Sequence, residues 1–267
     1  MAKSPWKKGV VAGQAVAAVI ARQIEHQQAN EDFRPTRLTI DFFRPVPMRP
    51  LRVTTSTVRT GKRIKVADAE VLCDDEIVAH ASCLLLKSSE QPVEKIWKPS
   101  RSPLVPPEVI PGEHPDSRGP IFGSDGHPTG WSRDITQHVG VTRKRMWALG
   151  MPAVEGDELS PFVAAAIVGE ATSFVTNWSQ GGVSFINSDL TLALSRMPNG
   201  LEMGIEADNH MSVDGIAIGT ATLYDSLGSF GTCIVTSLSN IARQVSVENL
   251  SSHNSSIVDQ SLPSGMN

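Results

Sequence analysis

Cysteine is scarce in this sequence, and no pattern typical of a metal site is present. The three cysteines, Cys73, Cys83 and Cys233, are odd in number, lie in strand-like segments and lack metal-ligand spacing. We therefore expect buried, reduced thiols in a cytoplasmic protein. Glycine-rich phosphate loops and a histidine-centred nucleophile motif are also missing, so no cofactor and no metal is expected.

The chain has no excess of positive charge. Its net charge of −4 argues against nucleic acid as a partner, because phosphate binding needs concentrated lysine and arginine. The basic run TRKR at residues 142–145 is interpreted as a solvated strand edge. The alternative is that this run meets the phosphates of a nucleotide-bearing ligand.

Long apolar runs are missing as well. No stretch approaches the roughly 20 residues that a membrane span needs. A secretory signal is not expected either, because Gly13, Gln14 and Arg22 interrupt the N-terminal apolar stretch. A cytoplasmic location follows as the expectation.

The sequence indicates that the same structural unit occurs twice in the chain. RLTIDFFR at residues 37–44 and DLTLALSR at residues 189–196 share Leu-Thr-aliphatic and a final arginine at an offset of 189 − 37 = 152. VLCD at residues 71–74 corresponds to TLYD at residues 222–225 at an offset of 225 − 74 = 151. A repeat this long indicates a duplicated domain, because solenoid and propeller repeats have periods of about 20–50 residues.

Each half reads as an alanine-rich helix followed by antiparallel strands. The first helix is predicted over residues 9–26, where Gly9 and Gly13 would let its first turn approach another backbone closely. The second begins at Ser160 as the cap, with Pro161 at its first position, and runs to about Phe174. Strands are predicted at residues 36–43, 51–59, 64–73, 76–87, 184–194, 201–208, 215–224 and 229–239.

Composition divides the chain into four parts. Residues 1–87 and 131–248 form the two units, and residues 88–130 are a proline-rich linker, in which a strand ladder is not expected. Residues 249–267 are rich in serine and asparagine and are predicted to be a disordered tail.

Three motifs in order give the sequence a family resemblance. WKKGVVAGQA at residues 6–15, Phe43-Arg44-Pro45 and FINSDLT at residues 185–191 resemble segments of the type II acyl-CoA thioesterase family, over most of residues 5–238. The resemblance implies an α+β, double hot-dog fold with two long central helices, each wrapped by an antiparallel sheet. The family usually has a first strand before the segment that begins at residue 6. Either the native chain starts further upstream or the first unit lacks an edge strand.

The resemblance also implies a catalytic set. In the family an Asp on the second helix, a Thr on the next strand and a Gln on the last strand activate a water, and these positions fall on Glu170, Asn187 and Thr236. Glu170 can act as the general base and Asn187 offers both a donor and an acceptor. Thr236 would hold a water less firmly than an amide.

Each candidate also has a purely structural interpretation. Glu170 would be a partly exposed carboxylate near a helix C-terminus, where the helix dipole disfavours it. Asn187 would bond a neighbouring loop, and Thr236 would be an ordinary strand residue. Asp189 is expected on the same sheet face as Asn187, in an ion pair with Arg196 or with the other half.

One further polar cluster occurs at residues 208–210, Asp-Asn-His. It lies at the end of a predicted strand. We interpret it as a turn.

The predicted function is that of an acyl-CoA thioesterase, which hydrolyses fatty acyl thioesters (acyl-CoA or another acyl thioester) to the free acid and thiol. The acyl chain would lie between the second helix and its sheet, against Phe162, Ile167 and Phe174, with Asp189 also near the substrate. The alternative is a non-catalytic acyl-CoA or lipid binder, because two of the three family side chains have changed. A hot-dog hydratase is a weaker hypothesis, since neither helix start shows its Asp and His pair. A homodimer or larger assembly is expected.

Overall fold

The first half of the chain is one helix followed by a four-stranded meander. The computed structural model describes residues 3–4, 7–98, 100, 102–108 and 119–246. The elements of the first half are helix α1 (Gly13–Gln28) and strands β1 (Phe33–Phe42), β2 (Arg52–Thr60), β3 (Ile64–Cys73) and β4 (Glu76–Lys87). All four predicted strands are therefore confirmed, with bounds that shift by up to three residues.

The second half repeats this order with more interruptions. It contains β7 (Lys144–Leu149), α2 (Pro161–Glu170), α3 (Thr172–Asn177), β10 (Phe185–Asn187), β11 (Asp189–Leu194), β12 (Glu202–Val213), β13 (Ile216–Asp225) and β14 (Gly228–Ser239). Two short strands, β8 (Trp178–Ser179) and β9 (Gly182–Val183), form a separate hairpin. Ser160 accepts a bond from the amide of Val163, so the predicted cap is confirmed.

The linker segment contains a strand that composition did not predict. β5 (Ile121–Ser124) pairs with β7 and with β6 (Trp131–Ser132), although it lies within residues 88–130. Prolines flank this stretch at residues 120 and 128 but do not enter it, so its backbone donors remain available for a ladder. The predicted tail from residue 249 lies outside the described residues.

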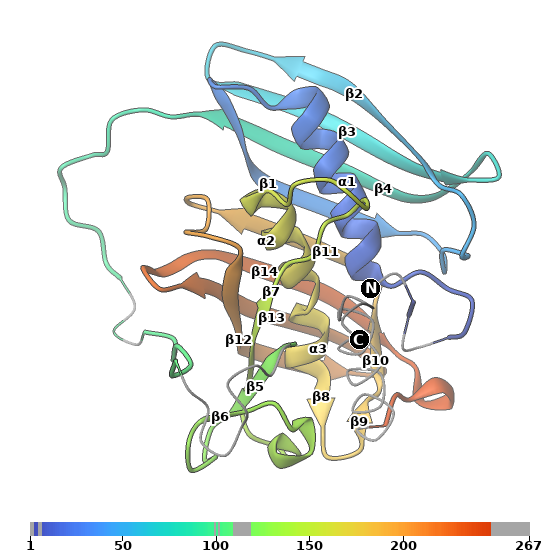
Figure 1. Cartoon of the computed structure of the whole chain (residues 1–267), viewed down its shortest axis with the longest axis vertical. Coiled ribbons are helices and arrows are strands. Elements are labelled where there is room, and N and C mark those ends of the chain that lie inside the picture. Colours follow the sequence, from blue (N-terminus) through green and yellow to red (C-terminus); the bar gives the residue numbers. More distant parts are fainter. Residues whose placement is uncertain (1–2, 5–6, 99, 101, 109–118, 247–267) are drawn as a thin grey trace, which may run out of the picture.

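The strands form one large antiparallel sheet in which the two halves mirror each other. Its main order is β2-β3-β4-β1-β11-β14-β13-β12-β7-β5-β6, so the two halves meet at β1 and β11 (Figure 1). Thr39 pairs with Thr191 in this junction, and their hydroxyl oxygens are 3.0 Å apart. These two residues occupy equivalent places in the sequence repeat. The offset of 152 thus corresponds to an internal two-fold relation centred on this pair.

The two halves differ at their outer edges. In the second half β7 covers the side of β12, whereas β2, the counterpart of β12, pairs only with β3 among the described residues. The first unit therefore shows an open edge strand in the part of the chain that the structure describes.

The helices pack against one face of the sheet, where the core lies (Figure 1). α1 is a single helix of 16 residues, and its buried side chains include Val16, Ile20 and Ile24. The second helix is instead divided, because Ala171 interrupts it between α2 and α3. The residues from Phe162 to Gly169 are all buried, as expected for a helix that is apolar on every side.

Two of the sequence interpretations are wrong. Lys144 and Arg145 are buried in β7, so the basic run is not a solvated strand edge. Residues 208–210 lie within β12 beside a bulge and do not form a turn. All three cysteines are buried and free, which confirms the reduced thiols.

Arg145 forms a buried ion pair whose loss should be costly. Its Nε donates to Oε2 of Glu206 at 2.8 Å, and both side chains are 4% exposed. We expect Arg145→Ala to lower the free energy of unfolding by about 3–5 kcal/mol, because the Glu206 carboxylate would lose its buried partner. Arg143→Ala is the matched control, since its half-exposed guanidinium is 3.6 Å from Glu206 and should contribute less than about 1 kcal/mol. Equal losses in urea denaturation of the two variants would contradict this expectation.

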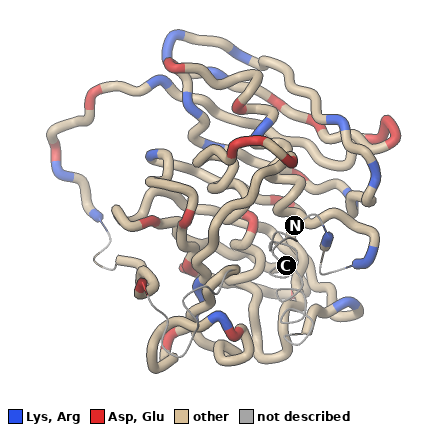
Figure 2. The backbone as a smooth tube through the Cα atoms, viewed as in Figure 1, with Lys and Arg blue, Asp and Glu red and all other residues tan. Residues whose placement is uncertain are grey.

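Charges are interspersed along the described backbone rather than gathered on one basic surface (Figure 2). Within the described part of the chain, no helix has both the length and the apolar character needed to cross a membrane.

Candidate active site

Glu170 lies where the two helical segments meet. It is the last residue of α2, directly before the break at Ala171, and it is half-buried. A Cβ added to Gly13, the first residue of α1, would overlap Oε1 of Glu170. The predicted close approach occurs at Gly13 alone, and its neighbour is the side chain of Glu170 and not a backbone; a Cβ added to Gly9 would meet nothing within 4 Å.

The N-terminus of α1 has unused hydrogen-bond donors at this place. Ala12 occupies the cap position without a capping side chain, and the first turn of α1 has no acidic residue. Among the described residues, the backbone amides of Gly13 and Gln14 have no hydrogen-bond acceptor. A helix N-terminus carries partial positive charge, so it can stabilise a negatively charged oxygen placed here.

The carboxyl group of Glu170 has a pKa that suits proton transfer near neutral pH. Burial raises the pKa of Glu170 to about 8, and the neighbouring amide of Asn187 opposes part of this rise. A general base works best when its pKa is close to the working pH.

Asn187 faces Glu170 across the site. Its Nδ2 is 3.5 Å from Oε1 of Glu170 and 3.3 Å from the carbonyl oxygen of Asp189. The first contact is at the long limit of a hydrogen bond. The structure thus brings together two of the three side chains that the family resemblance selected.

Thr236 and Asp189 form a separate pair at a β-bulge. Asn187 pairs with Ser237 of β14, but Thr191 pairs with Ile234, so one extra residue is inserted before β11. The Asp189 carboxylate accepts the Thr236 amide at 2.5 Å and lies 3.4 Å from its hydroxyl. The bulge interrupts the strict alternation on which the shared face of Asn187 and Asp189 was predicted.

Asp189 forms no ion pair with a described residue, so the expected pair with Arg196 is wrong. Arg196 instead binds Asp225 through two bonds of 2.6 and 2.7 Å. The carboxylate of Asp225 also accepts the backbone amides of Asn199 and Leu227, so this pair fixes a turn.

Ser237 is a site residue that the sequence did not reveal. It is buried, it pairs with Asn187 across the strands, and its hydroxyl is 3.4 Å from Nδ2 of Asn177. The bulge shifts the register by one residue: the Thr191–Ile234 register, if continued, would place Leu238 opposite Asn187, but Ser237 stands there. A shift of this kind leaves no signal in the residue pattern.

Cys233 lies near the site but cannot act as its nucleophile at neutral pH. Burial, assisted by the nearby charges of Glu170 and Asp189, raises the pKa of Cys233 to about 12. A thiol must ionise to attack a thioester. Cys233 therefore stays protonated and packs as part of the hydrophobic core.

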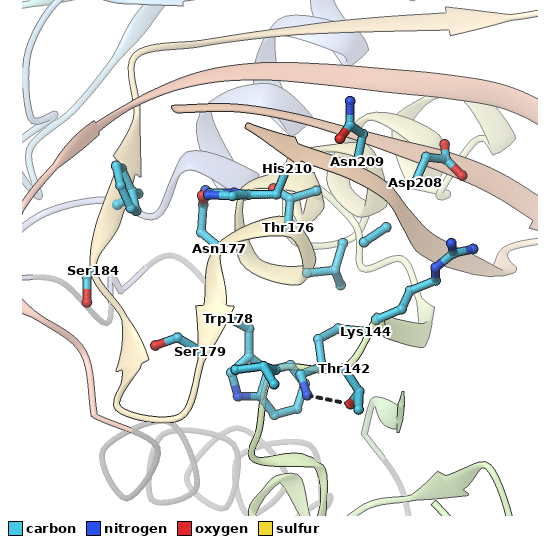
Figure 3. Close-up of a pocket in the computed structure, with 15 residues that line it drawn as sticks. Thr142, Lys144, Thr176, Asn177, Trp178, Ser179, Ser184, Asp208, Asn209 and His210 are labelled. Atoms are coloured by element: carbon cyan, nitrogen blue, oxygen red, sulfur yellow. Dashed lines mark hydrogen bonds between the residues drawn. The ribbon is translucent and has the colours of Figure 1, made fainter. Parts of the chain in front are cut away.

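The apolar residues predicted to hold the acyl chain are packed within the core. Phe162 and Ile167 are buried, and Phe174 stacks on Trp178 with ring centroids 4.9 Å apart. None of the three lines the cavity in Figure 3.

That cavity has a volume of about 400 Å³ and lies beside the C-terminal end of α3. Its walls come from α3, the start of β7, β10 and β12, and they include Lys144, Asn177, Trp178 and Phe185 (Figure 3). The described residues contain no group of three or more His, Cys, Asp or Glu side chains suited to a metal ion.

The contact between Gly13 and Glu170 leads to a prediction. Gly13→Ala should reduce kcat at least about tenfold, because the added methyl group would displace the carboxylate from the start of α1. Gly9→Ala provides a control for local backbone effects: its added Cβ meets nothing within 4 Å, although its φ of +78° strains an alanine. The rate of thiol release from an acyl-CoA measures both, and a Gly13→Ala variant as fast as the wild type would refute the contact.

Comparisons with known proteins agree with this architecture. Residues 2–86 match the family model described as the acyl-CoA thioesterase N-terminal domain. None of the curated proteins matches the sequence significantly.

Solved structures match over nearly the whole chain. The tesB protein of Mycobacterium avium subspecies paratuberculosis is 15% identical with a TM-score of 0.63, covering 89% of this chain and 90% of that one. The acyl-CoA thioesterase II TesB2 of Mycobacterium marinum is 12% identical with a TM-score of 0.60, covering 85% and 88%. A hot-dog protein of unknown function from Alicyclobacillus acidocaldarius is 16% identical with a TM-score of 0.56, covering 89% and 90%.

These likenesses show a hot-dog fold, as the sequence predicted. The match of residues 2–86 to the acyl-CoA thioesterase N-terminal domain confirms the family resemblance over this part of the chain.

Proposed function

We propose that this protein hydrolyses acyl-CoA thioesters and that Glu170 is its general base. The observation that carries the proposal is the desolvated carboxyl of Glu170, which lies against the uncapped N-terminus of α1. This arrangement puts a proton acceptor beside backbone donors, the two elements that thioester hydrolysis requires. The match to an acyl-CoA thioesterase domain supports the substrate class.

The reaction follows from these groups. The ionised Glu170 takes a proton from a water molecule, whose oxygen attacks the thioester carbonyl carbon. The carbonyl oxygen becomes negatively charged, and the amides of Gly13 and Gln14 stabilise it. The carbon–sulfur bond then breaks, and the thiolate receives the proton that Glu170 holds. The products are the free acid and coenzyme A.

Two polar side chains support the base in this proposal. Asn187 holds one carboxyl oxygen of Glu170 and limits its rotation. Ser237, directly opposite Asn187 in the strand pairing, offers a hydroxyl on the same face as Asn187. Thr236 and Asp189 instead preserve the bulge that sets the position of Asn187.

The finer features of the fold belong to the same proposal. The mirrored strand orders and the Thr39–Thr191 centre support a double hot-dog, in which α1 and the divided α2–α3 segment are the two central helices. A homodimer or larger assembly and a cytoplasmic location remain predictions.

A panel of acyl-CoA thioesters of increasing chain length tests the proposed activity. Purified protein is incubated with each thioester and with a reagent that reports free thiol. We expect release well above the rate without protein for at least one chain length. A ligand that stabilises the protein against heat but is never hydrolysed would instead support the non-catalytic acyl-CoA binder.

A further inference from the structure

The outer face of the sheet, opposite the helices, carries an exposed apolar patch in the second half of the chain (Figure 1). The residues of β13 that face the core, such as Ala217 and Ala221, are buried, so the residues between them point to the outer face. Six large apolar side chains lie on this outer face near the hairpin between β12 and β13 and are 37–73% exposed: Met211, Val213, Ile216, Ile218, Ile234 and Leu238. These six residues form the apolar patch.

The apolar patch is continuous across three strands. Val213 pairs with Ile216, which in turn pairs with Leu238, so these three form the row next to the hairpin. Met211 pairs with Ile218 in the following row. Residues that pair directly in an antiparallel sheet point to the same face, with Cβ atoms about 5 Å apart. The side chains therefore form one surface rather than separate exposed residues.

The chain covers the other end of this face but leaves the apolar patch open. Tyr224 also points to the outer face, where it is fully buried and its hydroxyl donates to the carbonyl oxygen of Leu104 in the linker at 2.9 Å. At the patch, Asp214 and Gly215 make a two-residue turn with φ of +51° and +77°. A turn this tight cannot fold back over the sheet. Among the described residues, the uncovered apolar part of this face is therefore the patch.

The equivalent face of the first half is charged. The offset of 152 residues places Asp68 and Glu70 of β3 at the positions that Thr220 and Thr222 occupy in β13. The Asp68 carboxylate lies 3.8 Å from Nε2 of His80 on the neighbouring strand. A solvated face of an antiparallel sheet normally carries polar and charged side chains. Their replacement in the second half indicates a face that another surface covers.

We propose that the apolar patch is the contact surface between two copies of this chain, packed patch to patch about a two-fold axis. Patches of about 300–600 Å² are the largest that a typical monomer exposes, and six large side chains reach this class. A standard interface buries about 800 Å² on each partner, so the patch and the threonines beside it supply most of one side. Two sheet faces pack about 10 Å apart with their strands within about 30° of each other, which suits two flat surfaces of this kind. The inference names the surface of the expected assembly and does not depend on the proposed catalysis.

The distribution of charge selects a second copy as the occupant. The described outer-facing residues of segments 209–213, 216–220 and 234–238 include no charged side chain, so this surface offers no partner to a nucleic acid or a charged peptide. Docking of the patch on the first half of another copy would bury Asp68 and Glu70 against apolar side chains, which is costly. The patch is therefore best matched by itself. A two-fold arrangement then buries both patches and closes the assembly at two copies.

The test compares equivalent positions in the two halves. Ile216→Lys introduces a charge in the middle strand of the patch, and Ile64→Lys introduces the same charge 152 residues earlier, in the first half. In sedimentation velocity, the wild type should be a dimer of twice the chain mass of 28.7 kDa. Ile216→Lys should raise the Kd of the dimer at least about thirtyfold, the effect of losing an interface hot spot, and Ile64→Lys should leave it within about threefold. A monomeric wild type, or two variants with the same Kd, would overturn the proposal.

Cross-linking tests the same surface without adding a charge. Ile218→Cys places a thiol on the patch, and Ile64→Cys is the matched control because the two isoleucines are 37% and 39% exposed. The three native cysteines are buried. A short bismaleimide should join two copies of Ile218→Cys, since packed sheets lie about 10 Å apart, and should leave Ile64→Cys as single chains. No cross-linking of Ile218→Cys, or equal cross-linking of both variants, would contradict the proposed contact. A dimer that hydrolyses no thioester would refute the proposed activity alone, and an active monomer would refute this inference alone.

Discussion

Glu170→Gln should reduce kcat for acyl-CoA hydrolysis by about 10²–10⁴-fold, the usual contribution of a general base. Glutamine has the same shape and can still accept the bond from Asn187, so the variant removes the proton acceptor and little else. The initial rate of thiol release measures the effect. Glu25→Gln on α1 is the matched control, because it removes a half-buried helix carboxylate that lies outside the site, and it should keep the wild-type rate.

The same variant should be more stable than the wild type at alkaline pH. Burial raises the pKa of Glu170 from 4.5 to about 8, so the folded protein binds a proton that the unfolded chain has released between these values. The contribution of this carboxyl to stability is full below pH 4.5, falls as pH rises and is lost above about pH 8. Glu170→Gln escapes that loss. A slow variant that is also less stable at pH 9 would indicate misfolding rather than loss of a base.

The pH dependence of the wild type should follow the ionisation of this one carboxyl. Only the ionised form of Glu170 accepts a proton, so kcat/KM should rise about tenfold per pH unit on the acid side and level off above about pH 8. Rates are corrected for the hydrolysis that occurs without protein. A profile that is already flat from pH 6 upward would contradict the assignment of the base.

Asn187→Ala should shift the midpoint of this pH profile in a defined direction. The amide of Asn187 lowers the pKa of Glu170, so its removal should move the midpoint of the profile to higher pH. An unchanged midpoint would mean that the contact at 3.5 Å has no energetic effect.

The duplication was predictable because it depends on local patterns. Strand alternation, turn residues and a repeat at constant offset are all visible in one sequence, and they locate the strands; the structure then shows that the repeat is centred on the pairing of Thr39 with Thr191. The family motifs similarly bring Glu170 and Asn187 together correctly.

The features that the sequence did not predict depend on contacts between segments that are distant along the chain. One inserted residue at the bulge places Ser237 instead of Leu238 opposite Asn187, and the sequence carries no mark of that shift. The burial of Lys144 was unexpected because a basic run is normally solvated, and it becomes visible only when α3 covers the start of β7. Tertiary packing decides both outcomes.

The most direct test of the central claim is a titration of the Glu170 carboxyl itself. The measurement uses carbon-13 NMR of protein labelled at the glutamate carboxyl carbon, with the signal assigned by its absence in Glu170→Gln. The account predicts a midpoint near pH 8 that coincides with the midpoint of kcat/KM. A carboxyl that titrates near its ordinary value of 4.5, or an activity profile with no inflection at the Glu170 midpoint, would contradict it.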